Sequence, residues 1–258
     1  MQINLNTNNY YNTQPTFKSL RAKVFKPVGN GFHIPEFSHN RDTAVYRKDM
    51  DWKKLVSFIT NKYKDIPKVK IYEYGCSNLS EAYTFLIQLK ADNTDEVFNK
   101  FLPIIAKDRD IDAIVDATDE FLPMNIDEVK LINKHTGRRF FDFFEKNCQY
   151  DSQSYYFKPK SILRDNVKVG LGDITRDYVN IPKKDSVVMA RNFWVYLTDE
   201  ERVELAQNLY NHLEGNNVLI LGHHDYREWD VDSPLNAINL LKKAGFKETD
   251  IPYVLTKD

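Results

Sequence analysis

The chain has 258 residues, of which 42% are hydrophobic and 13% aromatic, enough for one large core. Its 36 basic and 37 acidic side chains leave a formal net charge of −1, which argues against nucleic acid or an anionic membrane as a partner. Cys76 and Cys148 are too few for a disulfide framework or a cysteine-rich zinc site. Without a leader or an apolar run of about 18 residues, the sequence predicts a cytoplasmic protein.

The amino-terminal stretch differs in composition from the rest of the chain. It is rich in Asn, Thr, Gln and Tyr and has no period that could bury one face of a helix or strand. Residues 25–40 then combine two prolines and two glycines with scattered aromatic side chains, which is typical of an irregular surface segment. We therefore predict a flexible arm over residues 1–41 and one folded domain over residues 42–258.

Regular patterns begin at about residue 42. The first predicted helix is supported by apolar side chains at helical spacing: Trp52, Leu55, Val56 and Ile59. The stretch KVKIYEYG then predicts a strand that ends at Gly75. Helices are predicted over residues 80–89 and 95–106, and IDAIVDATD predicts a second strand that ends at Asp119. Helical crossovers between consecutive strands favour a parallel sheet.

The second half of the chain continues this alternation. Helices are predicted over residues 127–132 and 138–146, and strands over 166–169, 186–190 and 218–221. The clearest helix follows a capping box formed by Thr198 and Glu201. The final helix starts at residues 233–234 and stops at Gly245, and a strand around residues 253–255 closes the sheet. The sequence thus predicts an α/β fold.

Ligands bind at the carboxyl ends of the strands in such a sheet, so the residues after each strand form the candidate site. After the first strand, Gly75 permits a tight turn, Ser77 and Asn78 offer small polar groups, and the next helix presents N–H donors. Asp119 could accept both hydroxyls of an adenosine ribose. The alternatives are a plain turn at Gly75 and a helix cap at Asp119.

The later strands supply further polar side chains. Asp173 follows VKVGLG, and SVVMARNFWVYL brings Arg191, Asn192 and Tyr196 to the end of its strand. The alternative for Arg191 is a paired surface charge. The alternative for Tyr196, and likewise for Trp194, is an aromatic side chain in the core. Residues 223–225 (His-His-Asp) are not predicted to bind a metal, because adjacent histidines in a strand point to opposite faces.

Together these segments resemble the chemotaxis-receptor methyltransferases of the CheR type, which use S-adenosylmethionine (SAM) to methylate glutamate carboxylates. TAVYR at residues 43–47 is similar to the family's T-x-F-F-R, and YGCSNLSEAYT to A-G-C-S-T-G-E-E-P-Y-S. ATDEF is similar to A-T-D-I-S, VKVGLGDI to V-x-F-x-x-x-[ND]-L, ARNFWVYL to C-R-N-V-L-I-Y-F, and EGNNVLILGHHD to P-G-G-x-L-x-L-G-x-x-E. Order and spacing agree over about residues 42–225.

The resemblance implies a Rossmann-like class I methyltransferase fold, with a mostly parallel seven-stranded sheet and helices on both faces. It also implies SAM as the cofactor, bound by Thr43, Arg47, Gly75, Ser77, Glu81, Asp119, Asp173 and Asn192. Arg47 and Tyr196 would lie nearest to the transferred methyl group. Two departures concern the loop after the first strand, where Leu79 replaces a glycine and could crowd the cofactor, and Ser80 replaces a glutamate. The sequence does not predict a helical, Arg-rich domain ahead of Thr43.

We therefore predict a SAM-dependent methyltransferase that methylates a carboxylate oxygen, such as that of a protein glutamate, so that the partner is a protein substrate. An ionised carboxylate is already a nucleophile, so transfer needs alignment and desolvation rather than a general base. One alternative is a domain that binds SAM or a protein but has lost catalysis, which Leu79 and Ser80 favour. Another is a small-molecule methyltransferase on the same fold.

Overall fold

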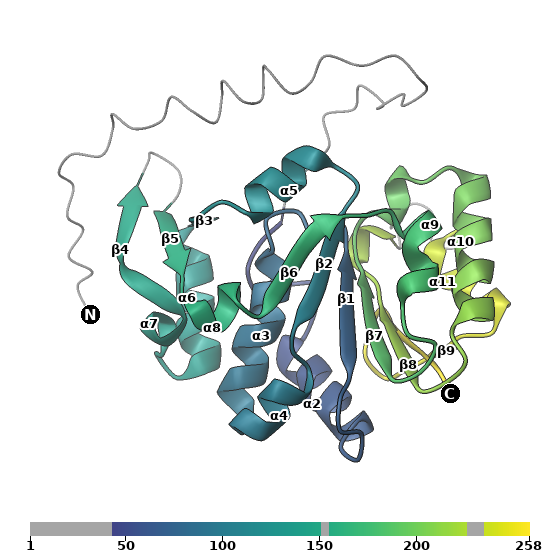
Figure 1. Ribbon diagram of the computed structural model, residues 1–258, viewed down its shortest axis with the longest axis horizontal. Coiled ribbons are helices and arrows are strands. Elements are labelled where there is room, and N and C mark those ends of the chain that lie inside the picture. The colour runs from purple at the N-terminus through teal and green to yellow at the C-terminus, as the bar shows by residue number, and fades with distance from the viewer. Residues whose placement is uncertain (1–42, 151–154, 226–234) are drawn as a thin grey trace.

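The centre of the computed structural model is a seven-stranded sheet in the order β6-β2-β1-β7-β8-β10-β9 (Figure 1). The structure describes residues 43–150, 155–225 and 235–258. The five strands from β6 to β8 are parallel, whereas β10 is antiparallel to both β8 and β9. The strands are β1 (Lys70–Tyr74), β2 (Ile104–Asp108), β6 (Val167–Leu171), β7 (Ser186–Ala190), β8 (Asn217–Ile220), β9 (Lys247–Glu248) and β10 (Val254–Lys257).

The order of the strands reverses at β1. Strands β2 and β6 continue the sheet on one side of β1, and β7 and β8 continue it on the other. At such a switch point the connecting loops diverge, which leaves room for a ligand above the carboxyl ends of the strands. The prediction of a mostly parallel seven-stranded sheet is confirmed.

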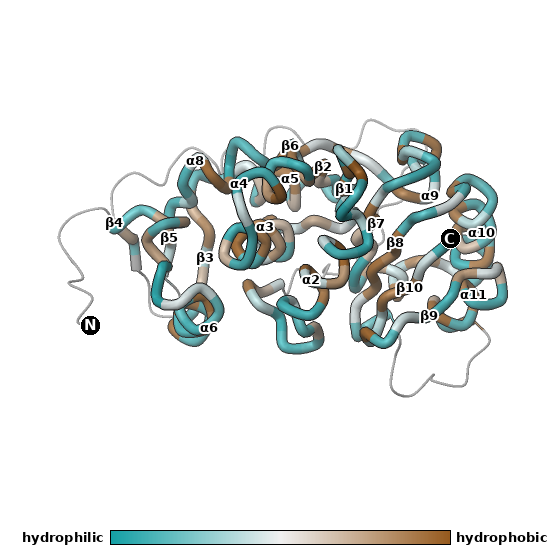
Figure 2. The backbone as a smooth tube through the Cα atoms, turned by 90° about the horizontal axis from the view of Figure 1, so that it is seen from below, coloured by the Kyte–Doolittle hydropathy of each residue, from teal (hydrophilic) through white to brown (hydrophobic). Residues whose placement is uncertain are grey.

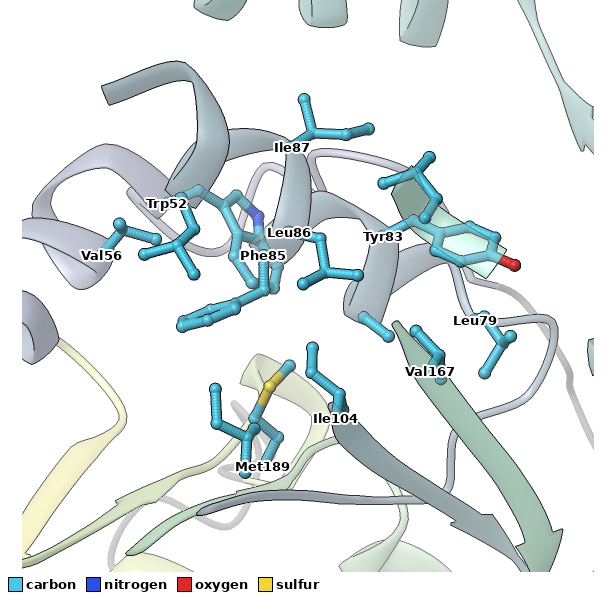
Figure 3. Packing of buried hydrophobic residues seen from close by; sticks show 14 of the residues in the cluster. Trp52, Val56, Leu79, Tyr83, Phe85, Leu86, Ile87, Ile104, Val167 and Met189 are labelled. Carbon is cyan, nitrogen blue, oxygen red and sulfur yellow. The ribbon is translucent and has the colours of Figure 1, made fainter. Parts of the chain in front are cut away.

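Helices cover both faces of the sheet (Figures 1 and 2). One layer contains α2 (Trp52–Lys62) and α3 (Ser80–Asp92), and the other contains α9 (Ile174–Asp177), α10 (Asp199–His212) and α11 (Ala237–Ala244). Strand β1 shows how alternation separates the two cores, because Ile71 belongs to one buried cluster and Tyr72 and Tyr74 to the other. In Figure 3, side chains of α2 and α3 such as Trp52 and Phe85 pack over Met189 of β7.

Several helix ends follow directly from local sequence. The capping box predicted at Thr198 and Glu201 is present at the start of α10. Helix α11 begins after its cap Asn236. The predicted start of this helix at residues 233–234 and the predicted arm over residues 1–41 both lie outside the described residues. No helix among the described residues is both long and apolar enough to cross a membrane.

Two predictions between residues 95 and 119 are wrong. The predicted helix over residues 95–106 divides into α4 (Asp95–Lys100) and strand β2, since Pro103 cannot continue a helix. The predicted second strand is helix α5 (Ile111–Ala117), which the Asp110 side chain caps by accepting from the N–H of Asp112 at 2.9 Å. Asp119 therefore follows a helix instead of a strand.

A second, three-stranded sheet was not predicted. It has the antiparallel order β3-β5-β4, with β3 (Leu122–Met124), β4 (Phe144–Tyr150) and β5 (Tyr155–Pro159). The predicted helix over residues 138–146 is limited to α7 (Phe140–Phe143), after which the chain enters β4. Helix α6 (Ile126–Thr136) confirms the prediction over residues 127–132, and α8 (Ser161–Arg164) leads into β6. This small sheet lies to one side of the central sheet (Figure 1).

Candidate active site

A pocket lies at the carboxyl ends of four parallel strands, at the point where the strand order reverses. Each strand contributes the residues that follow it, and the segment before α2 adds two more. The polar and charged lining residues are Thr43, Arg47, Cys76, Ser77, Glu81, Asp108, Arg109, Asp110, Asp173, Arg191, Asn192 and Tyr196. The other lining residues include Tyr74, Gly75, Gly172, Ile174 and Phe193. Residues as far apart in the sequence as Thr43 and Leu197 thus line one pocket.

The loop after β1 is a tight turn that is hydrogen-bonded to β2. Gly75 has φ +74°, which a glycine adopts without steric cost, and its N–H donates to the carbonyl of Lys107 at 2.9 Å. The N–H of Ser77 donates to Oδ2 of Asp108 at 3.1 Å. These bonds hold the loop, and the beginning of α3 that follows it, against the end of β2.

Arg191 is the buried cation on which several segments of the site converge. Its side chain is only 1% exposed. Its Nε donates to Oε2 of Glu81 at 2.8 Å, its Nη2 to both carboxylate oxygens of Asp49 at 3.0 and 3.1 Å, and its Nη1 to the carbonyl of Leu221 at 3.1 Å. The guanidinium also lies over the Trp52 ring. The alternative of a paired surface charge is therefore wrong.

This network fixes the direction of two predicted site residues. Glu81 is held by Arg191 through one oxygen, and its other oxygen accepts a weaker bond from Nδ2 of Asn192 at 3.4 Å. Asp49 belongs to the same segment as Arg47, so its bonds to Arg191 secure that segment above β7. Although burial alone would raise it, the pKa of Asp49 is lowered by Arg191 and by the N–H of His223. Arg191 thus acts as a structural link beneath the pocket.

Asp225 organises the backbone at the ends of β7 and β8. Its carboxylate accepts from the N–H groups of Asn192, Trp194 and Gly222 at 2.6, 3.0 and 2.8 Å. Residues His223–Asp225 form a short 3-10 helix, so the strand assumed for them in the sequence analysis is wrong. Among the described residues, no group of three His, Cys, Asp or Glu side chains could hold a metal ion. The role of Asp225 is to hold the loop that carries Asn192.

Acidic residues line the other end of the pocket, at β2 and β6. Asp108 ends β2, is largely buried, and accepts from the N–H groups of Ser77 and Asp110 at 3.1 and 2.9 Å. Burial raises its pKa. Asp173 follows β6 and caps α9, and its Oδ1 accepts from both the N–H and the hydroxyl of Thr175 in that helix. Each carboxylate has its position set by backbone donors.

Asp119 is the one predicted site residue that does not line the pocket. It is exposed and accepts from the N–H of Phe121 at 3.1 Å, as a turn residue does. The acid at the end of the second strand is Asp108, in IIAKD. The alternation of IIAKD after Pro103 was the available signal, because it is typical of a short strand and ends in an acid.

Arg47 and Tyr196 lie on the open side of the pocket. The side chain of Arg47 is 17% exposed, and its Nε lies 3.9 Å from Asp49. Tyr196 ends the 3-10 helix Trp194–Tyr196 and is 41% exposed, so the alternative of a core position is wrong for this residue. Trp194 is buried, so the predicted core position is confirmed for Trp194. The other predicted residues Thr43, Gly75, Ser77, Glu81, Asp173 and Asn192 also line this pocket.

Leu79 does not crowd the pocket. It adopts a left-handed conformation with φ +71°, but its side chain is 2% exposed and packs in the core near Val167 (Figure 3). Ser80 is equally buried and donates from its hydroxyl to Asn78 at 2.7 Å. The expectation that Leu79 crowds the cofactor is wrong, because its side chain is buried in the core and is not among the lining residues of the pocket.

A comparison with curated proteins finds a related sequence. A chemotaxis protein methyltransferase from Borreliella burgdorferi is 24% identical over 160 residues, which cover 61% of this chain and 52% of that protein. The chain therefore spans about half the length of this curated relative.

Two solved structures illustrate the likeness in fold. An amino pentose methyltransferase from Micromonospora echinaspora, solved with bound SAM, is 12% identical with a TM-score of 0.35, over 67% of this chain and 51% of that one. A TehB-like SAM-dependent methyltransferase from Corynebacterium glutamicum is 10% identical with a TM-score of 0.39, over 80% of this chain and 94% of that one.

The family assignment rests on the sequence match and on the order of the sheet. The sequence profile described as the SAM-binding domain of CheR methyltransferases matches residues 41–237, which contain every lining residue of the pocket. The matched segment also contains the five parallel strands of the central sheet. The chain belongs to the CheR methyltransferase family and has a Rossmann-like class I fold.

Proposed function

We propose that this chain is a SAM-dependent methyltransferase that methylates a carboxylate oxygen of a protein glutamate, with SAM held in the pocket above β6, β2, β1 and β7. One observation supports this most directly. Side chains matched to the family motifs at Thr43, Arg47, Glu81, Asp173 and Asn192 meet in a single pocket, although they come from four separate segments. The Borreliella burgdorferi relative, a chemotaxis protein methyltransferase, favours a protein acceptor.

The residues of the pocket fit SAM in their chemistry. In this proposal, Asp108 accepts from the ribose hydroxyls and Asp173 from the adenine amino group, because an ionised carboxylate only accepts hydrogen bonds. Glu81 and Asn192 receive the ammonium of the methionine part. The acids thus come from both ends of the pocket, and Gly75 allows the backbone to approach the ligand between them.

The protein's own contribution to transfer is alignment and exclusion of water. When bound, SAM supplies a methyl group on a positively charged sulfur, which an ionised carboxylate attacks without losing a proton. We assign to Arg47 the pairing with the acceptor carboxylate as it approaches, and to Tyr196 a hydrogen bond that orients it. Phe193 and Ile174 line the pocket and reduce its water content. No general base is needed.

The positions of Leu79 and Ser80 support the proposed activity over a domain without catalysis. That alternative depended on Leu79 and Ser80, and both side chains are buried outside the pocket lining. Each makes a structural contact, Leu79 in the core and Ser80 with Asn78. The two departures from the family pattern therefore leave the proposed activity chemically possible.

The acceptor is tested with SAM labelled in its methyl group. Candidate acceptors are Glu-rich helical peptides, matched Gln-containing peptides, and small carboxylic acids. A methyl ester on glutamate is hydrolysed by alkali and releases the label as volatile methanol, whereas a methyl group on nitrogen stays in the peptide. We expect alkali-labile label on the Glu peptides only, and its loss in Arg47→Ala but not in the exposed control Lys130→Ala. Label that resists alkali, or that enters only small acids, would overturn the proposed acceptor.

A further inference from the structure

Glu73 is a buried carboxyl for which the reaction described above has no use. It lies on β1, where alternation directs it to the same face as Ile71, toward α3. The residue is 3% exposed, and its Oε2 has no hydrogen-bond partner among the described residues. A buried carboxylate without partners is costly, so this position requires either a proton on Glu73 or a compensating charge nearby.

The groups that face Glu73 come from every element packed around it. Helix α3 contributes Glu81, Tyr83 and the backbone N–H of Ala82, which opposes the rise in the Glu73 pKa. The turn contributes Cys76, the end of β2 contributes Asp108, and the residue after β7 is Arg191. Of the described charged groups that act on Glu73, Glu81 and Asp108 are acidic and Arg191 is basic.

Arg191 cannot neutralise this cluster alone. Its hydrogen bonds already go to Glu81, to Asp49 and to a carbonyl, and none goes to Glu73. Burial raises the pKa of Glu73 well above its usual value, Glu81 raises it further, and Arg191 opposes this only in part. In the free protein the cluster therefore favours a protonated Glu73.

The position of this cluster matters because the cofactor and its product differ in charge. SAM carries a positive sulfonium, and S-adenosylhomocysteine (SAH) has a neutral sulfur with otherwise the same groups. Glu81 and Asp108 both line the pocket and both act on Glu73, so a cation bound in the pocket adds positive charge next to carboxyls that raise the pKa of Glu73. Arg47 and Arg109 also line the pocket, but Arg191 is the basic residue that acts on Glu73. A ligand with a neutral sulfur adds no such charge next to these carboxyls.

We propose that Glu73 is a specificity-determining residue that gives up its proton when a cationic ligand occupies the pocket and regains it from solvent when the ligand is neutral. The ionised carboxylate then favours SAM over SAH, and reprotonation removes the attraction once the methyl group has left. Methyl transfer to an ionised acceptor neither takes up nor releases a proton, so the proton of Glu73 exchanges with solvent alone. The inference rests on the proposed location of SAM in this pocket.

The test is the number of protons released on binding. Titration calorimetry of the full chain with SAM, SAH and sinefungin, an analogue with an ammonium group at the sulfonium position, is run in phosphate and in Tris at the same pH. The difference in heat between the two buffers gives the proton count. We expect SAM and sinefungin to release up to one proton more than SAH. Below the pH at which free Glu73 ionises, SAM affinity should fall about tenfold per pH unit while SAH affinity stays constant.

Glu73→Gln is the decisive variant, because it keeps the shape and removes the titration. In this variant, SAM and SAH should release equal numbers of protons, and their affinity ratio should no longer depend on pH. Glu128→Gln is the matched control: Glu128 is also a buried glutamate whose pKa burial raises, but it lies outside the pocket lining. Effects on shared contacts cancel in the SAM-to-SAH ratio, so the control should keep the wild-type difference.

Three outcomes are informative. Equal proton counts for SAM and SAH in the wild-type protein would refute the inference without any variant, even if Glu73→Gln failed to fold. A proton difference that persists in Glu73→Gln would assign the titration to another carboxyl, such as Asp225, and would also refute it. If folded wild-type protein bound neither ligand, the proposed cofactor pocket would be wrong, and this inference would fail with it.

Discussion

Replacement of Arg191 by methionine should cost a large part of the stability of the fold. The side chain is 1% exposed and bonds to Asp49, Glu81 and the carbonyl of Leu221. Arg191→Met would leave two carboxylates, 14% and 10% exposed, without their cation. Removal of one partner from a buried ion pair costs about 3–5 kcal/mol. Because both acids retain some contact with solvent, we expect about 3 kcal/mol.

The measurement is urea unfolding followed by tryptophan fluorescence, for which Trp52 beneath the guanidinium and the buried Trp194 are suitable probes. Arg191→Lys keeps the charge but not the planar fork, so it should lose less, about 2 kcal/mol. Lys130→Met removes an ion pair whose side chains are 69% and 75% exposed and should change stability by less than about 0.5 kcal/mol. A loss below about 1 kcal/mol in Arg191→Met would refute the role of Arg191 as a buried link.

The same ion pair predicts that the free energy of unfolding depends on pH. Pairing with Arg191 lowers the pKa of Asp49 in the folded protein. The ionised Asp49 therefore stabilises the fold fully above its pKa in the unfolded chain, about 3.9, and this stabilisation is lost as the pH falls through its pKa in the folded protein. Unfolding free energies measured from pH 6 to pH 3 should therefore fall more steeply in the wild-type protein than in Arg191→Met. Parallel curves for the two proteins would contradict this linkage.

The remaining predictions concern single positions. Asp108→Ala should abolish calorimetric binding of SAH, whereas Asp119→Ala should leave it unchanged, and the reverse result would restore the assignment drawn from sequence. Leu79→Gly relieves the strain of a left-handed conformation, about 1–2 kcal/mol, but removes a buried side chain that contributes about 2–5 kcal/mol. The free energy of unfolding in urea should therefore fall by about 1–3 kcal/mol, and the affinity for SAH should stay unchanged. Tyr196→Phe should slow methyl transfer about tenfold by loss of one hydrogen bond, with the urea midpoint unaltered because the side chain is 41% exposed; unchanged transfer would exclude Tyr196 from the acceptor site.

Local sequence patterns were sufficient where neighbouring residues determine the structure. The capping box of Thr198 and Glu201 identified α10, and β-rich residues before Gly75 identified β1, because capping and turn formation involve residues only a few positions apart. The order of the family motifs likewise indicated most of the lining residues. Asp119 was predicted in the site because IDAIVDA before it was read as a strand, and the period of this short apolar run fits a strand or a helix equally well.

What only the tertiary structure decided depends on contacts between distant segments. The pairing of Arg191 with Asp49, 142 positions away, turned an apparent surface charge into a buried link. Burial of Leu79 and of Glu73 likewise depends on how α3 packs against the sheet. The sequence by itself determined the local elements, the α/β class and the family, since these follow from short-range patterns and motif order. Charge burial and the identity of the second strand followed from sheet assembly, because desolvation and strand pairing are set by residues that the chain brings together from afar.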